Sequence, residues 1–75
     1  MTIPKVTTLL VVRFNNGRKT MPSQLRCSWT NLPRVDEADL RGRALNMLLQ
    51  DAKVLAEGFT RHDVTILSFD VSIPG

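Results

Sequence analysis

The feature that most constrains the fold is an apolar run followed directly by a turn sequence. Val6–Phe14 (VTTLLVVRF) is rich in β-branched residues, which favour the extended backbone of a strand, and Asn15-Asn16-Gly17-Arg18 comes directly after it. Asn-Gly supplies the positive φ angles that a two-residue type I′ hairpin loop needs. The sequence therefore predicts a β-hairpin whose second strand runs to about Cys27.

The position of the loop also predicts which side chains share a face. With Asn16-Gly17 as the loop, Phe14 would lie opposite Lys19 and Val6 opposite Cys27. Side chains alternate along a strand, so we expect the more apolar set to face the core, and a slip of one residue would exchange the two faces. That set is Val6, Thr8, Leu10, Val12 and Phe14, opposite Cys27, Leu25, Ser23, Met21 and Lys19.

The opposite face of the hairpin is the candidate contact surface. Leu9 and Val11 would form an apolar patch framed by Arg13 and Arg26. Arg18 and Lys19 would lie at the loop end. Pro22 cannot donate to a ladder, so the second strand is expected at an edge of the sheet or bulged, which leaves the other side of the first strand free for a partner.

An amphipathic helix is predicted from Asp36, as its N-cap, to about Glu57, with Gly58 as the C′ residue and Phe59 folding back onto Val54. Its apolar sector is wider than a three-stranded sheet requires, which hints at a second packing partner. That sector holds Leu40, Ala44, Leu45, Leu48, Ala52, Leu55 and Ala56.

The last segment, Val64–Ile73, alternates as a strand should. Leu67, Phe69, Val71 and Ile73 are expected to face the helix together with Thr65. The residues expected on the other face are Val64, Ile66, Ser68, Asp70 and Ser72.

The order β-β-α-β predicts an α+β fold in a single domain over residues 1–75, with a three-stranded antiparallel sheet in the order 2-1-3 and the helix on one face. The third strand would then be a long edge with little charge. Edges of that kind invite pairing with another chain, so a homodimer through the third strand or through the open sheet face is expected.

Few residues in the sequence could carry chemistry. A single Cys27 excludes an internal disulfide and favours a reducing compartment, the cytoplasm, and one Cys with one His62 cannot make a structural zinc site. Cys27 is expected to be buried, and His62 beside Asp63 to be a solvated turn residue. No stretch reaches the roughly 18 apolar residues of a membrane span, and the N-terminus lacks the pattern of a signal peptide. We therefore expect a protein that is not an enzyme and needs no cofactor or metal.

The charge distribution points to an acidic partner. Residues 1–34 hold six Lys and Arg and no Asp or Glu, a formal charge of +6, whereas residues 35–75 hold four basic and seven acidic residues, a formal charge of −3. An apolar centre with a charged rim is typical of protein interfaces, so a protein-binding module or inhibitor that occludes a larger protein is the preferred interpretation. Size alone suggests an accessory protein of a bacteriophage or another mobile element. The alternative is a basic hairpin that binds DNA or RNA phosphates through Arg13, Arg18, Lys19 and Arg26.

Overall fold

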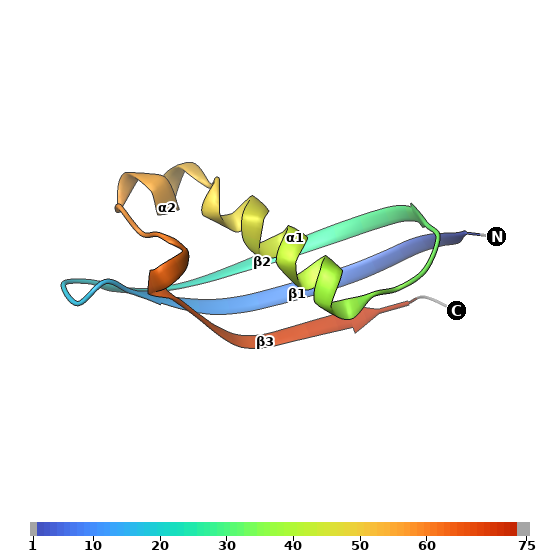
Figure 1. Ribbon diagram of the computed structural model, residues 1–75, viewed down its shortest axis with the longest axis horizontal. Coiled ribbons are helices and arrows are strands. Elements are labelled where there is room, and N and C mark those ends of the chain that lie inside the picture. The colour runs from blue at the N-terminus through green and yellow to red at the C-terminus, as the bar shows by residue number, and fades with distance from the viewer. Residues whose placement is uncertain (1, 74–75) are drawn as a thin grey trace.

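The computed structural model describes residues 2–73 and has one sheet and one helical layer (Figure 1). The strands are β1 (Ile3–Asn15), β2 (Thr20–Leu32) and β3 (Val64–Ser72). The helices are α1 (Glu37–Leu49), α2 (Ala52–Ala56) and a 3-10 turn, η1 (Arg61–Asp63). The sheet has the order β2-β1-β3, and β1 is antiparallel to both neighbours. The predicted β-β-α-β fold and strand order are confirmed.

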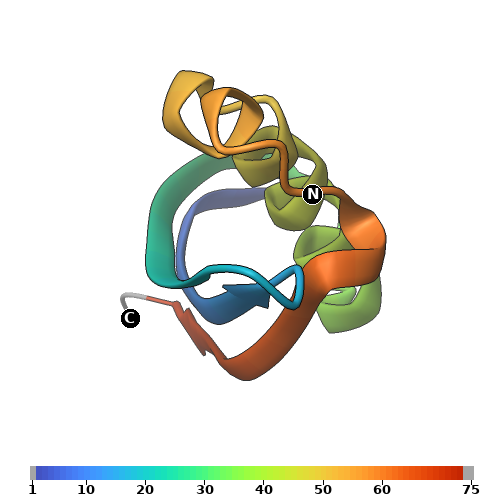
Figure 2. The same ribbon diagram turned by 90° about the vertical axis from the view of Figure 1, so that its left-hand side faces the viewer.

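The molecule is elongated because the hairpin is long. Two strands of 13 residues, at about 3.3 Å per residue, span roughly 43 Å, close to the longest extent of 47 Å. Viewed along this axis, the helices lie inside the curve of the sheet (Figure 2). β2 runs past the predicted limit near Cys27 as far as Leu32, because Trp29 lies opposite Val6 and packs against the core.

The core is built on alternate residues of β1. Val6, Leu10, Val12 and Phe14 have no exposed surface, and Thr8 is 1% exposed. They pack against the inner side of the helical layer, where Leu40, Ala44, Leu45, Leu48, Val54 and Phe59 are buried. The prediction that these β1 residues face the helix is confirmed.

The predicted pairing of the two hairpin strands is wrong by two residues, because the loop is longer than predicted. Asn15 pairs with Thr20, Phe14 with Met21 instead of Lys19, and the loop is Asn16–Lys19. A type I′ turn needs positive φ at both central residues, but of the two only Gly17, at 86°, has it. Because a shift of two preserves the alternation of side chains, the assignment of faces survives.

Asparagine side chains explain the longer loop. The Asn16 Oδ1 accepts hydrogen bonds from the amides of Arg18 and Lys19, both at 2.9 Å, and the Asn15 Oδ1 accepts one from Gly17 at 2.9 Å. Asn side chains that bind the following amides in this way imitate a backbone turn. These hydrogen bonds stabilise a loop of four residues, Asn16–Lys19, which is two residues longer than the loop that Asn-Gly alone predicts.

The helix predicted up to Glu57 is interrupted at Gln50 and Asp51. The Asp51 backbone is extended, and its Oδ1 accepts a hydrogen bond from the Lys53 amide at 3.0 Å, so it caps α2 as a separate helix. Asp competes with the helical backbone in this way. The placement of Ala52, Leu55 and Ala56 in the buried sector is therefore wrong, since all three are exposed.

Both predicted helix ends are confirmed. The Asp36 Oδ1 accepts a hydrogen bond from the Asp39 amide at 3.2 Å, which makes Asp36 the N-cap of α1. At the other end Gly58 has a φ of 77°, and the Phe59 amide donates to the Val54 carbonyl at 3.3 Å. Phe59 is buried and stacks on Phe14 with ring centroids 5.1 Å apart, which joins this end of the chain to the core.

A β-bulge in β3 overturns half of the predicted alternation of this strand. Val11 pairs with Ser68 but Val12 pairs with Ile66, so Leu67 has no partner on β1. Phe69 and Val71 lie opposite Leu10 and Thr8 on the helix side, as predicted.

In the part of β3 that precedes the bulge, the side chains alternate in the opposite sense to the prediction. Val64 and Ile66 lie on the helix side, opposite Phe14 and Val12, and Thr65 lies opposite Arg13 on the open face. Leu67 and Ile73, which were expected to be covered by the helix, are 54% and 53% exposed.

Within residues 2–73, no helix combines the length and the apolar character required to cross a membrane.

Candidate protein-binding interface

The open face of the sheet presents the candidate residues in three cross-strand rows. In the first, Leu9 of β1 lies between Arg26 of β2 and Asp70 of β3. The other two rows are Gln24, Val11 and Ser68, and Pro22, Arg13 and Thr65. Opposed residues in neighbouring strands share a face, so these nine side chains form one surface, which we call the Leu9/Val11 face.

The centre of the Leu9/Val11 face is apolar and its rim is charged. Leu9 and Val11 are half-buried between their neighbours, while Arg13 and Arg26 are exposed. Within the described part of the chain both helices pack on the other face of the sheet (Figure 2). The sheet thus leaves this apolar centre facing solvent.

The observed register brings Arg26 closer to the apolar centre than the predicted one. The expected partner of Arg26 was Thr7, but the two-residue shift places Arg26 directly opposite Leu9. Arg13 stays on the same face, opposite Pro22. Arg13 therefore follows Val11 along β1, and Arg26 lies across the ladder from Leu9.

Sequence reasoning missed Lys5, which extends the Leu9/Val11 face beyond these nine side chains. Lys5 pairs with Thr30, is exposed, and shares the odd-numbered alternation of Leu9 and Val11. The signal was available, because residues separated by an even number along a strand share a face. Lys5, Arg13 and Arg26 give this face three positive charges against the one negative charge of Asp70.

The loop residues contribute unequally. Arg18 is exposed at the tip of the hairpin, whereas the Lys19 Nζ lies 2.8 Å from the Glu57 Oε2 at the end of α2. This ion pair draws Lys19 toward the helical layer and offsets its charge. The structure thus separates Lys19 from the other five candidate residues.

All four aromatic side chains lie on the helix side of the sheet. Phe14 and Phe59 are buried and stacked, Trp29 lies opposite Val6, and Phe69 lies opposite Leu10. Single-stranded nucleic acids are usually bound by stacking bases on exposed rings. The Leu9/Val11 face provides no such ring.

The potential nucleophile and base are far apart. Cys27 lies opposite Thr8. His62 belongs to η1, which ends directly before Val64, the residue that pairs with Phe14. These rungs, at Thr8 and Phe14, are six residue steps apart along β1, about 20 Å. Burial raises the pKa of the Cys27 thiol, which disfavours its nucleophilic form. The Asp63 carboxylate is held by the Thr60 amide at 2.8 Å.

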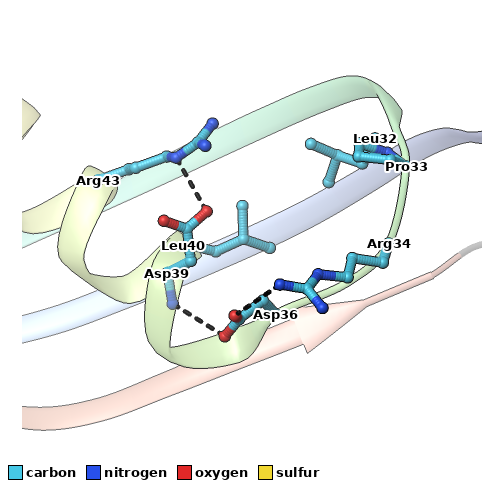
Figure 3. A pocket seen from close by; sticks show the side chains of 7 residues that line it. All are labelled: Leu32, Pro33, Arg34, Asp36, Asp39, Leu40 and Arg43. Carbon is cyan, nitrogen blue, oxygen red and sulfur yellow. Dashed lines mark hydrogen bonds and ion pairs between the residues drawn. The ribbon is translucent and has the colours of Figure 1, made fainter.

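A pocket of about 320 Å³ lies between the β2–α1 connection and the first turns of α1 (Figure 3). Its charged side chains already have partners within the chain. Arg43 Nε lies 3.0 Å from Asp39 Oδ2, and Arg34 Nη2 lies 4.0 Å from Asp36 Oδ2, the N-cap of α1. Leu32, Pro33 and Leu40 form the apolar part of the wall. We assign this pocket a structural role at the helix start.

Residues 2–73 contain no group of three or more His, Cys, Asp or Glu side chains placed to hold a metal ion. Comparisons with protein-family models, with curated proteins and with solved structures find no match to the chain. Proposals about function therefore rest on the chemistry of the Leu9/Val11 face.

Proposed function

We propose that the chain is a non-catalytic protein-binding module of the cytoplasm that binds an acidic protein through the Leu9/Val11 face and acts by occluding part of that partner. The observation that carries this proposal is the first row of the face, in which the half-buried Leu9 lies beside the exposed Arg26 on an uncovered sheet. Small accessory proteins of phages and other mobile elements act in this manner, and the size of the chain suits that origin.

The physical support comes from the anatomy of protein interfaces. Such interfaces combine a central apolar patch with a polar rim, and Arg is enriched in them because its aliphatic part packs while its guanidinium binds carboxylates. Leu9 and Val11 supply the apolar centre, and Lys5, Arg13 and Arg26 supply the rim. The excess of positive charge would steer an acidic partner to this face.

Two double variants test the proposal. Leu9→Asp with Val11→Asp places carboxylates at the apolar centre and should abolish binding of the acidic protein. Arg13→Glu with Arg26→Glu should weaken binding at least tenfold and remove its dependence on salt. Binding is measured by affinity purification from the native cell with mass spectrometry, and then with the purified partner.

Matched controls on the helical layer separate the face from general effects of charge. Met47→Asp places a carboxylate at an exposed apolar residue of α1, and Arg41→Glu with Lys53→Glu reverses two exposed charges on the helices. These variants should bind as the wild type does. Equal binding by wild type and by the Leu9→Asp, Val11→Asp variant would show that another surface is used.

A second function is favoured by a separate observation. The hairpin half of the sequence contains no Asp or Glu, and its exposed Arg18 lies at the tip of a ribbon that is itself basic. Such a ribbon could bind nucleic-acid phosphates with little sequence specificity. In that case nuclease treatment removes the captured material, and Arg18→Glu weakens retention of duplex DNA or RNA whereas Leu9→Asp with Val11→Asp does not.

A further inference from the structure

β3 differs from the other edge of the sheet in having little protection against pairing. β2 carries Pro22 and Arg26, and proline and basic residues are two of the devices by which proteins block an exposed edge. β3 (VTILSFDVS) has a single charge, Asp70, and no proline. Its outer side is unpaired in the sheet order β2-β1-β3.

The bulge exposes apolar side chains along this same edge. Leu67 is 54% exposed and Ile66, which lies on the helix side opposite Val12, is 38% exposed. α1 packs over β1 and β2, and although Val64 and Phe69 of β3 contact the core, Ile66 and Leu67 are left exposed. A long strand edge and an apolar strip therefore coincide.

The sequence of β3 complements itself in one antiparallel register. With a two-fold axis at Phe69, Leu67 would lie opposite Val71 of the second copy, and Ser68 opposite its Asp70. A shift of one residue places Asp70 opposite Asp70, and like charges directly opposite each other are destabilising. A shift the other way places Ile66, on the helix side, opposite the charged Asp70, on the open face. In the register about Phe69 the corresponding mismatch is milder, because Ile66 lies opposite the uncharged Ser72.

We propose that a second copy of this chain occupies the β3 edge, in antiparallel register about Phe69. A two-fold axis normal to the sheet joins the two three-stranded sheets into one of six strands, with both helical layers on the same face. Both Leu9/Val11 faces then lie on the opposite side. This self-association uses the outer edge of β3, which borders the Leu9/Val11 face, and it does not depend on the proposed partner.

The expected dimer is concentration-dependent. A standard interface buries about 800 Å² per partner, about one-sixth of the 5126 Å² exposed by this chain, so backbone pairing has to be supplemented by the apolar strip of Ile66 and Leu67. Interfaces at the small end of the range are weak, and we expect half-dimerisation on the order of tens of micromolar.

Sedimentation of the wild-type chain from about 1 to 500 μM, a range set by the expected weak interface, tests the association. We expect a monomer at the low end and a dimer at the high end. Leu67→Lys should raise the midpoint at least tenfold, because each dimer then brings two lysines to its apolar strip. Ser28→Lys, at an exposed position of β2, should leave the midpoint unchanged. A wild type that stays monomeric throughout this range overturns the proposal.

Cysteine cross-linking tests the register independently of Leu67. Ser68→Cys with Asp70→Cys should give a covalent dimer under mild oxidation, because directly opposed strand residues have Cα separations that a disulfide can bridge. In either single variant the new cysteines of the two copies lie two strand positions apart instead of opposite each other. Each single variant should therefore stay monomeric on a denaturing gel. A double variant that is dimeric in sedimentation but fails to cross-link overturns the register about Phe69.

Discussion

Thr8 is the polar side chain at the centre of the core face of β1. It is 1% exposed, and its Oγ1 accepts a hydrogen bond of 2.9 Å from the Trp29 Nε1. This bond satisfies an indole N–H that would otherwise be withdrawn from water next to apolar residues. A threonine in the apolar alternation of Val6, Leu10 and Val12 thus has a partner across the ladder.

Thr8→Val should therefore destabilise the protein although it makes the core more apolar. The substitution leaves the Trp29 Nε1 without its acceptor, at a cost of about 1–3 kcal/mol. Urea unfolding of Thr8→Val, Trp29→Phe and the double variant measures this cost. The penalty of Thr8→Val should shrink once Trp29 is Phe, and an undiminished penalty would mean that the hydrogen bond does not account for it.

Cys27 gives the stability a dependence on alkaline pH. Burial raises the pKa of its thiol above the ordinary value of 9.0, so above that pH the unfolded chain loses a proton that the folded chain retains. Its contribution is fully present below about pH 9 and is lost as the pH rises through the folded-state pKa. The difference in unfolding free energy between wild type and Cys27→Ala should be constant at pH 7–9 and fall above it. A difference that grows with pH would contradict the burial assigned to this thiol.

At the scale of elements, irregular segments determine where side chains point. The Asn16 loop moves the hairpin register by two, the Asp51 cap turns α2 away from the axis of α1, and the Leu67 bulge reverses the phase of β3. Two of these irregularities come from short polar side chains that bind nearby amides. The third accommodates one extra residue in a ladder whose ends are fixed by Phe69 and Val64.

The bulge predicts an asymmetry between two single-residue deletions in β3. Deleting Leu67 makes the ladder continuous, since Ile66 and Ser68 keep their partners Val12 and Val11, and we expect a folded protein whose stability changes by about 1 kcal/mol or less. Deleting Asp70 moves either Phe69 or Val71 off the helix side and should cost about 2 kcal/mol or more.

Thermal unfolding followed by circular dichroism distinguishes the two deletions. A Leu67 deletion as damaging as the Asp70 deletion would mean that the bulge residue is required for packing, rather than an insertion that the ladder tolerates.

At the scale of the whole molecule, the protein depends on β1. This strand forms both ladders, five of its side chains are at most 1% exposed, and α1 packs against it. The basic hairpin and the mainly acidic remainder meet in this arrangement, with Lys19 and Glu57 in contact at 2.8 Å. The open face thus retains positive charge while part of the loop charge is offset.

Hydrogen exchange should reproduce this hierarchy. Amides of β1 are expected to exchange slowest, and amides of the short α2 and of the outer edges of β2 and β3 fastest. On raising the protein concentration into the dimer range, the β3 edge should gain protection while the β2 edge does not. Equal protection of all three strands would contradict a fold centred on β1.

The sequence by itself determined the three strands, the outer limits of the helical segment, their order and the two faces of β1, because these follow from short-range alternation, from Pro22, and from caps such as Asp36 and Gly58. It also determined the central residues of the candidate face, Leu9, Val11, Arg13 and Arg26, since an error of two residues in register preserves them, but it missed Lys5 and placed Thr65 on the wrong face. Only the tertiary structure decided that Arg26 lies beside Leu9, that Lys19 is paired with Glu57, and that Leu67 lies in a bulge. The first outcome depends on how the Asn15 and Asn16 side chains bind the loop amides. The other two depend on contacts between segments that are distant in the sequence, which local preferences do not determine.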